Sequence, residues 1–301
     1  MTHMHTAPYG SWKSPIIPDL LLSNAINIGL CALDGEDTYW IEGRPSEGGR
    51  NVIVRRGADG AVADMTPPPF NARTRVHEYG GGDYVVSNGT LYFSNFVDQR
   101  LYRVTPGAEP EALTPEVKLR YADAIIDSSR DRLICVCDDH TNPEREAVNT
   151  LAGISLANGQ ARVLVAGNDF YSTPRLSPDG SRLCWLTWNH PNMPWDGTEL
   201  WLGEIDGNGE VVNARCIAGG LTESIFQPQW SPNGQLYFIS DRTGWWNIYR
   251  QSNGKSEALY TQATDFGVPH WVFGMSTYAF ISPQRIICWY TQNGIWHLAS
   301  L

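Results

Sequence analysis

Residues 174–188 read PRLSPDGSRLCWLTW, and residues 228–240 repeat the same order of residue types in PQWSPNGQLYFIS. In each stretch a short apolar run leads into Ser-Pro-Asp/Asn-Gly, and a second apolar run follows. Asp-Gly and Asn-Gly supply the positive φ that tight turns between antiparallel strands need. The two stretches therefore predict the same strand–turn–strand unit at two places in the chain.

This unit is part of a longer repeat of strand, turn, strand, variable loop, strand, turn and strand, which the sequence contains six times. The first turns of the six units lie at Gly35, Gly89, Arg130, Gly180, Gly234 and Gln284, with spacings of 54, 41, 50, 54 and 50 residues. Four short strands per repeat are typical of β-propeller blades. The sequence predicts an all-β fold, a β-propeller of about six four-stranded blades or an incomplete seven-bladed ring. A β-sandwich also has short strands, but its period would be nearer to one strand than to four.

The repeat divides the chain into an N-terminal extension, residues 1–24, and a propeller, residues 25–301. Blades are expected near residues 25–66, 80–114, 121–167, 173–219, 227–263 and 276–301. The sixth unit stops after its third strand, IWHLASL, whose outer edge lacks a partner. We expect either a longer gene product or pairing of LLSNAINI, residues 21–28, with the sixth blade. An open ring would expose apolar strand edges and favour self-association.

The composition excludes several classes of protein. Lys and Arg number 22 against 32 Asp and Glu, and no basic cluster occurs, so a nucleic-acid surface is not expected. No apolar run reaches membrane-spanning length, and the N-terminus carries no secretory leader. The six cysteines lie mostly in apolar runs without a Cys-x-x-Cys pair, which indicates reduced thiols in the cytoplasm. We expect no metal and no cofactor.

One face of the predicted propeller collects the reactive side chains. Loops between second and third strands share this face with the links from one blade to the next. The link RTRVHEYGGGDY, residues 73–84, places three consecutive glycines beside Arg, His and Glu, so its backbone can approach a ligand or neighbour closely. The residues predicted to face a substrate or another domain are Arg75, His77, Glu78, Glu223, Asp241, Arg242 and Trp246.

The sequence assigns no catalytic residue. It lacks Gly-x-Ser-x-Gly, the turn that exposes a hydrolase serine, and it lacks His-Glu-x-x-His, the P-loop and the dinucleotide fingerprint. The strand–helix alternation of an α/β-hydrolase domain is also absent.

Five stretches resemble the propeller of the prolyl oligopeptidase family of serine peptidases, and most closely its dipeptidyl aminopeptidase/acylaminoacyl peptidase branch. The resemblance runs from about residue 8 to the C-terminus. It is carried by YWIEGRPSEGGR (39–50), RTRVHEYGGGDY (73–84), DFYSTPRLSPDGSRLCWLTWNHPNMPWDGTELW (169–201), QPQWSPNGQLYFISDRTGWWNIYR (227–250) and VPHWVFGMSTYAF (268–280).

The resemblance implies a propeller that gates and orients peptide substrates for a C-terminal α/β-hydrolase domain carrying Ser, Asp and His. That hydrolase domain is absent from this chain, so the resemblance implies a serine peptidase whose propeller is inactive alone. In the family the face with links and second-to-third-strand loops meets the hydrolase. One aminopeptidase branch holds the substrate's amino group with glutamates on the link before Trp-Ser-Pro-Asn-Gly, and Glu223 has a similar placement.

Two other functions stay open. A stand-alone propeller resembling the TolB type would bind a protein or peptide partner on the same face without catalysis. A propeller hydrolase with its own site would need a carboxylate or metal cluster at the channel, and no spacing in the sequence requires one. An open reading frame that continues past Leu301 into Gly-x-Ser-x-Gly would favour the peptidase.

Overall fold

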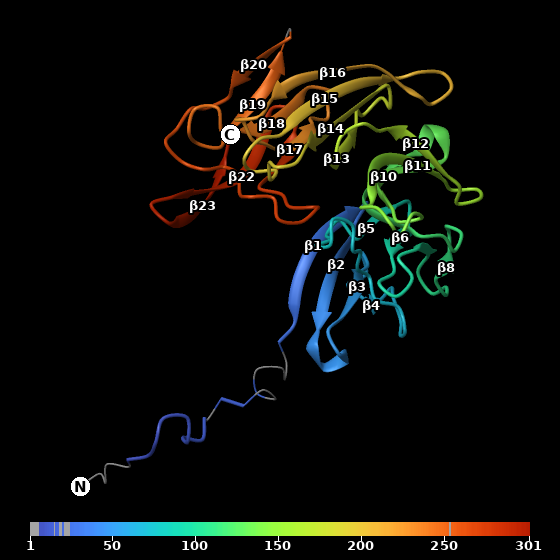
Figure 1. Cartoon of the computed structure of the whole chain (residues 1–301), viewed down its shortest axis with the longest axis vertical. Helices are drawn as coiled ribbons and strands as arrows, with labels where there is room; N and C mark the ends of the chain where they lie inside the picture. The colour runs from blue at the N-terminus through green and yellow to red at the C-terminus, as the bar shows by residue number, and fades with distance from the viewer. Residues whose placement is uncertain (1–5, 15, 18–19, 21–24, 253) are drawn as a thin grey trace.

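The structure, a computed structural model, describes residues 6–14, 16–17, 20, 25–252 and 254–301. Within these residues the chain forms six antiparallel sheets, in each of which neighbouring strands follow one another along the sequence (Figure 1). Five sheets have four strands and the sixth has three. The predicted all-β propeller with six blades is confirmed. None of the described helices is long and apolar enough to cross a membrane.

The first three blades occupy the N-terminal half of the chain. Blade 1 contains β1 (Asn27–Asp34), β2 (Asp37–Arg44), β3 (Arg50–Arg56) and β4 (Val62–Asp64). Blade 2 contains β5 (Tyr84–Ser87), β6 (Thr90–Ser94), β7 (Leu101–Val104) and β8 (Glu111–Ala112). Blade 3 contains β9 (Leu119–Asp127), β10 (Arg132–Asp139), β11 (Val148–Ser155) and β12 (Ala161–Val165). Two 3-10 turns occur at η1 (Pro45–Glu47) and η2 (Ser128–Arg130).

The last three blades follow in the same order. Blade 4 contains β13 (Phe170–Leu176), β14 (Arg182–Trp188), β15 (Glu199–Ile205) and β16 (Val211–Gly219). Blade 5 contains β17 (Ile225–Trp230), β18 (Leu236–Ser240), β19 (Asn247–Ser252) and β20 (Lys255–Ala258). Blade 6 contains β21 (Tyr278–Ser282), β22 (Arg285–Gln292) and β23 (Ile295–Ser300).

The apolar runs of the repeat are strands buried on both faces. In β14, Leu183 and Trp185 pack toward blade 3, whereas Cys184 and Leu186 pack toward blade 5. Alternate side chains of a strand point to opposite faces, so a strand between two neighbouring blades needs apolar residues at every position. This explains why RLCWLTW does not alternate with polar residues.

The two Ser-Pro-Asp/Asn-Gly turns have matching hydrogen bonds. The Ser177 hydroxyl donates to Asp179 Oδ1 at 2.6 Å, and the Ser231 hydroxyl donates to Asn233 Oδ1 at the same distance. The glycine of each turn has a left-handed backbone, with φ of 70° at Gly180 and 79° at Gly234. The repeated phrase of the sequence is therefore one turn structure used twice.

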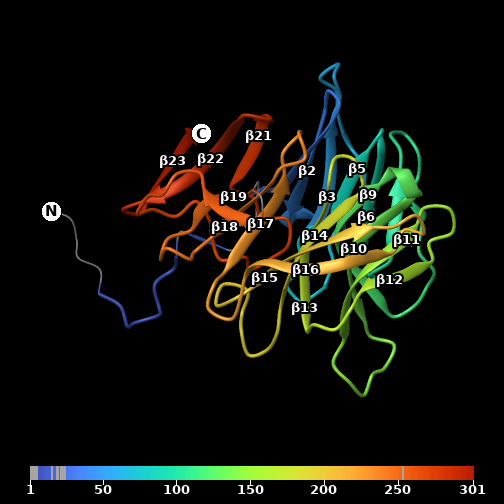
Figure 2. The ribbon, with the colours of Figure 1, turned by 90° about the horizontal axis from the view of Figure 1, so that it is seen from above.

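Five apolar clusters fill the five interfaces between consecutive blades. No such cluster joins blade 6 to blade 1 among the described residues, and Figures 1 and 2 show these two blades at the ends of the arc. Their uncovered faces are apolar: Ile28 of blade 1 is 75% exposed and Leu298 of blade 6 is 78% exposed. Of the predicted pairing segment 21–28, residues 21–24 lie outside the described residues, and Asn27 and Ile28 pair with β2.

Two inter-blade links that are far apart in the sequence contact each other. The link before blade 2 and the link before blade 6 form a parallel bridge between Gly81 and Phe273. The Phe273 backbone amide donates to the Gly80 carbonyl at 3.0 Å, and the Asp123 amide of blade 3 donates to the Gly82 carbonyl at 2.9 Å. The glycines of the first link thus bond both to the link before blade 6 and to blade 3.

Candidate functional site

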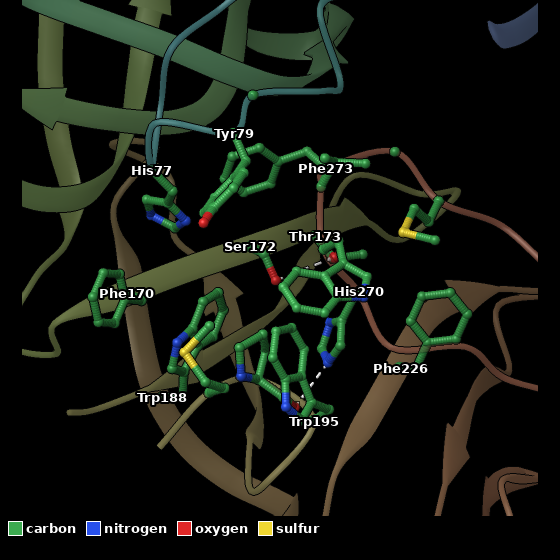
Figure 3. Close-up of a pocket in the computed structure, with 17 residues that line it drawn as sticks. His77, Tyr79, Phe170, Ser172, Thr173, Trp188, Trp195, Phe226, His270 and Phe273 are labelled. Atoms are coloured by element: carbon green, nitrogen blue, oxygen red, sulfur yellow. Dashed lines mark hydrogen bonds between the residues drawn. The ribbon is translucent and has the colours of Figure 1, made fainter. Parts of the chain in front are cut away.

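A hollow of about 270 Å³ opens on the face that carries the second-to-third-strand loops and the inter-blade links (Figure 3). We call it the aromatic pocket, because rings from five segments line it: His77, Tyr79, Phe170, Trp188, Trp195, Phe226, His270, Trp271 and Phe273. None of the residues that line it is Asp, Glu, Lys or Arg. An uncharged group can therefore bind in the pocket without the cost of removing water from a charged side chain.

The rings of the pocket hold one another in place. Phe170 and Trp188, from neighbouring strands of blade 4, stack with 5.4 Å between centroids and 15° between planes. Trp195 of the loop after β14 lies 4.2 Å from Trp271 of the link before blade 6. These are the offset and tilted arrangements that aromatic pairs prefer. The pocket is thus pre-formed, with its walls fixed by contacts between segments far apart in the sequence.

Two histidines in the pocket are uncharged at neutral pH. Burial lowers the pKa of His77 and the pKa of His270 to about 4. The Nε2 of His270 lies 2.8 Å from the Pro194 carbonyl oxygen, so Nε2 carries the proton and donates it. The His77 ring is enclosed by Phe170, Trp188 and Phe273, with centroids 5.2, 5.7 and 4.9 Å away. Both imidazoles act as part of the aromatic wall.

The link that carries His77 has a strained and closely fitted backbone. His77 and Glu78 both adopt positive φ, 52° and 64°, which non-glycine residues rarely do. A Cβ on Gly81 would lie 2.4 Å from the Phe273 carbonyl oxygen, so only glycine fits there. Strain of this kind persists where the surroundings fix the chain, and it clusters at functional sites.

A buried carboxylate supports this link from blade 3. Asp138 Oδ2 accepts a hydrogen bond from the His77 backbone amide at 2.9 Å. The Nε2 atoms of His77 and His140 each lie 4.0 Å from an Asp138 oxygen, beyond hydrogen-bond distance. Burial raises the pKa of Asp138 to about 7 and lowers the pKa of His140. The described residues contain no group of three or more His, Cys, Asp or Glu placed to hold a metal ion.

Comparison with solved structures identifies relatives of the whole arrangement. A puromycin hydrolase is 35% identical, with a TM-score of 0.90 over 99% of this chain and 48% of its own. A Mycobacterium tuberculosis puromycin-hydrolyzing peptidase is 36% identical, with a TM-score of 0.88 over 99% of this chain and 48% of its own. This chain belongs to the prolyl oligopeptidase family. It corresponds to a propeller portion and spans about half the length of these two structures.

More distant structures share the fold alone. An oligogalacturonate lyase in complex with manganese is 15% identical, with a TM-score of 0.59 over 87% of this chain and 73% of its own. No family model matches the sequence, and no curated protein matches it. Membership of the prolyl oligopeptidase family therefore rests on the solved structures that are about a third identical to this chain over nearly its whole length.

Several residues predicted from the sequence form ion pairs in the inter-blade links and second-to-third-strand loops. We call the face that carries these segments the link-and-loop face. Glu78 accepts hydrogen bonds from Arg75 at 3.0 Å and from Arg120 at 2.9 Å, and these guanidinium groups lower the pKa of Glu78. Glu223 accepts hydrogen bonds from Arg242 at 2.6 Å and from the Ser240 hydroxyl at 2.6 Å. We call these five charged residues the charged rim: Arg75, Glu78, Arg120, Glu223 and Arg242.

The remaining predicted residues have other roles. His77 lines the aromatic pocket itself. The Trp246 ring does not line the pocket but packs against two rings that do, with centroid distances of 5.7 Å to Phe226 and 6.2 Å to His270. Asp241 Oδ1 accepts a hydrogen bond from the Ser224 amide at 2.7 Å, which fixes the link between blades 4 and 5. Of these three residues, His77 lines the pocket, Trp246 packs against lining rings, and Asp241 holds the backbone of an inter-blade link.

Sequence reasoning missed most of the pocket. Trp188, Trp271 and His270 line it but were not among the predicted site residues. A signal was available, because His270 and Trp271 lie in VPHWVFGMSTYAF, and Trp188 and Trp195 lie in the longest of the stretches that resemble the family. The residue types alone gave no such signal, because tryptophan in short strands ordinarily fills the core.

Proposed function

We propose that this chain is the substrate-gating and substrate-orienting propeller of a serine exo- or oligopeptidase. The observation that carries the proposal is a relationship of about a third identity, over nearly the whole chain, to the propeller half of two puromycin-hydrolysing enzymes. The pre-formed aromatic pocket and the charged rim support it, because both lie on the face that would meet a hydrolase domain. Within the family we place the protein in the dipeptidyl aminopeptidase/acylaminoacyl peptidase branch.

In this proposal the chemistry belongs to a hydrolase domain outside the 301 residues. Catalysis there is acyl transfer to a serine followed by hydrolysis, and the propeller restricts access and holds the substrate. The chain alone is inactive. We also place the protein in the cytoplasm, since all six of its cysteines are unpaired and four of them are buried.

Activity assays test the proposal directly. The 301-residue chain and the complete gene product are compared on puromycin and on aminoacyl and acylaminoacyl p-nitroanilides. We expect turnover by the complete product alone, and we expect it to cleave short peptides but not a folded protein. Turnover by the purified 301-residue chain would contradict its assigned inactivity. A complete product without peptidase activity would instead favour a non-catalytic binding propeller.

The uncovered flanks of blades 1 and 6 lead to an expectation for the chain on its own. Ile28 and Leu33 on one flank, and Trp296 and Leu298 on the other, expose large apolar side chains. Apolar faces of this kind associate in water. We expect light scattering to show dimers or larger species of the 301-residue chain at high concentration, and a clean monomer would contradict this.

A further inference from the structure

We propose that the aromatic pocket binds one uncharged aromatic side chain of a peptide-like ligand. The proposal deepens the proposed function, and it rests on that function only for the identity of the ligand as a peptide. It follows from three properties of the described residues: the absence of charge in the pocket wall, the arrangement of the rings, and the polar groups at the base.

The first property selects against charged ligands. No carboxylate or guanidinium group lines the pocket, and its two imidazoles are neutral. Two buried carboxylates contact lining residues without lining the pocket themselves: Asp138 accepts a hydrogen bond from the His77 amide, and Asp123 accepts one from the Thr173 amide. A charged group entering the pocket would lose its water without a partner of opposite charge, which is costly.

The second property favours a flat ring over an aliphatic side chain. Phe170 stacks on Trp188, Trp195 packs against Trp271, and all four rings line the pocket; Figure 3 labels Phe170, Trp188 and Trp195 among the lining side chains. A ring that enters the pocket meets aromatic side chains from several segments of the chain. Such contacts attract a second ring beyond the effect of buried area, through the opposite charge of ring faces and edges.

The third property is a polar base and an entrance that is open to solvent. Ser172, which is almost fully buried, and Thr173 bring hydroxyl groups to the pocket lining from the first strand of blade 4. The entrance of the pocket is formed in part by the side chains of Met193 and Tyr79, which are 42% and 66% exposed. A side chain can therefore enter from the solvent side while its backbone stays outside, where a second domain could contact it.

Binding of capped amino acids to the 301-residue chain tests the proposal independently of any peptidase activity. N-acetyl-L-phenylalaninamide is compared by ligand-observed NMR with N-acetyl-L-leucinamide, 3-phenylpropionate and tetramethylammonium. We expect the phenylalanine amide to bind at least about fivefold more tightly than each of the others. Equal binding of the leucine amide would overturn the preference for rings. Tighter binding of tetramethylammonium would show a cation cage instead.

Two variants locate the binding in the pocket. Trp195→Ala removes one wall, and we expect about a tenfold loss of affinity for the phenylalanine amide. Trp245→Ala is the matched control, because Trp245 is 42% exposed on the same face and does not line the pocket. We expect it to leave binding unchanged. Equal losses in both variants would overturn the assignment of the site.

A variant at the pocket entrance keeps the test valid if Trp195→Ala fails to fold. Met193→Glu adds a carboxylate at an exposed position and leaves the core untouched. We expect it to weaken binding of 3-phenylpropionate most and of the neutral amide about threefold, whereas a cation cage would bind tetramethylammonium more tightly. If the complete gene product lacks peptidase activity while the amide still binds the chain, the proposed function fails and the pocket assignment stands.

Discussion

The aromatic pocket and the charged rim lie on one face of the propeller but differ in charge: the side chains of the rim are charged and paired, whereas those of the pocket are uncharged. In the rim, Glu78 pairs with two guanidinium groups and Glu223 pairs with Arg242. In the pocket, His77 and His270 stay neutral among rings. A paired surface charge already has its partner, whereas a hollow with uncharged walls still has a surface that a ligand can cover. The pocket is therefore the stronger candidate for specific contact.

The largest expected effect comes from the glycine link that forms one side of the pocket. Gly81→Ala places a Cβ 2.4 Å from the Phe273 carbonyl oxygen at a φ of 91°. We expect unfolding in urea to show a loss of about 3 kcal/mol. Gly89→Ala is the control, since Gly89 also has positive φ but open space around it, and it should cost about 1 kcal/mol. Equal costs would show that the link does not organise the pocket.

A second effect concerns the neutral imidazole of His270. Its native pKa is about 4, below the value of 6.5 for a free histidine, so the unfolded chain takes up a proton first as the pH falls. The wild-type chain should lose about 2 kcal/mol of stability from this group between pH 7 and pH 4.5. His270→Gln removes that loss, so the stability gap between variant and wild type narrows in acid. A constant gap for His270→Gln would contradict the neutral state of this imidazole.

Asp138 should show the opposite dependence on pH. Its native pKa is about 7 because of burial, so the folded protein holds this proton more tightly than the unfolded chain does. Stability from this group is present at low pH and is lost as the pH rises from about 4 to about 7. Asp138→Asn keeps an oxygen for the His77 amide and removes the titration.

We expect the Asp138→Asn variant to gain about 2.5 kcal/mol relative to wild type between pH 5 and pH 8, measured by chemical unfolding. The charged and titratable neighbours, His77, His140, Arg120 and Glu78, remain in both proteins. Asp139→Asn is the matched control, because the neighbouring Asp139 is only partly buried and accepts hydrogen bonds from the Thr141 amide and hydroxyl rather than from the His77 link. A pH-independent difference for Asp138→Asn would contradict a costly buried charge.

The fold could be predicted from the sequence because its signals are local. The turns at Gly180 and Gly234 and the apolar runs beside them fix strand, turn and strand within about a dozen residues. Counting such units gave six blades, the last with three strands, as the structure shows. The meeting of the two links at Gly81 and Phe273 could not be predicted, because it depends on how the ring of blades curves.

The pocket could be predicted only in part, because residue type does not separate a lining side chain from a core one. Trp185 and Trp188 lie three residues apart in β14, yet Trp185 is buried between blades 3 and 4 and Trp188 lines the pocket. Their surroundings differ because the strand passes out of the sheet interior toward the link-and-loop face. Charged residues were easier to select, but the sequence does not show that Arg120 of blade 3 already satisfies Glu78.

The smallest effect on stability is expected for the charged rim. Arg75→Ala and Glu78→Ala remove partners in exposed ion pairs, and such pairs contribute at most about 1 kcal/mol. We expect thermal unfolding of the 301-residue chain to change little in either variant. In the complete gene product we expect both variants to lower kcat/KM for a peptide substrate, because the rim is proposed to face the substrate or the hydrolase domain. If either variant instead unfolds the propeller, the charged rim stabilises the fold. It would then differ from the pocket in having a structural role rather than a role in binding.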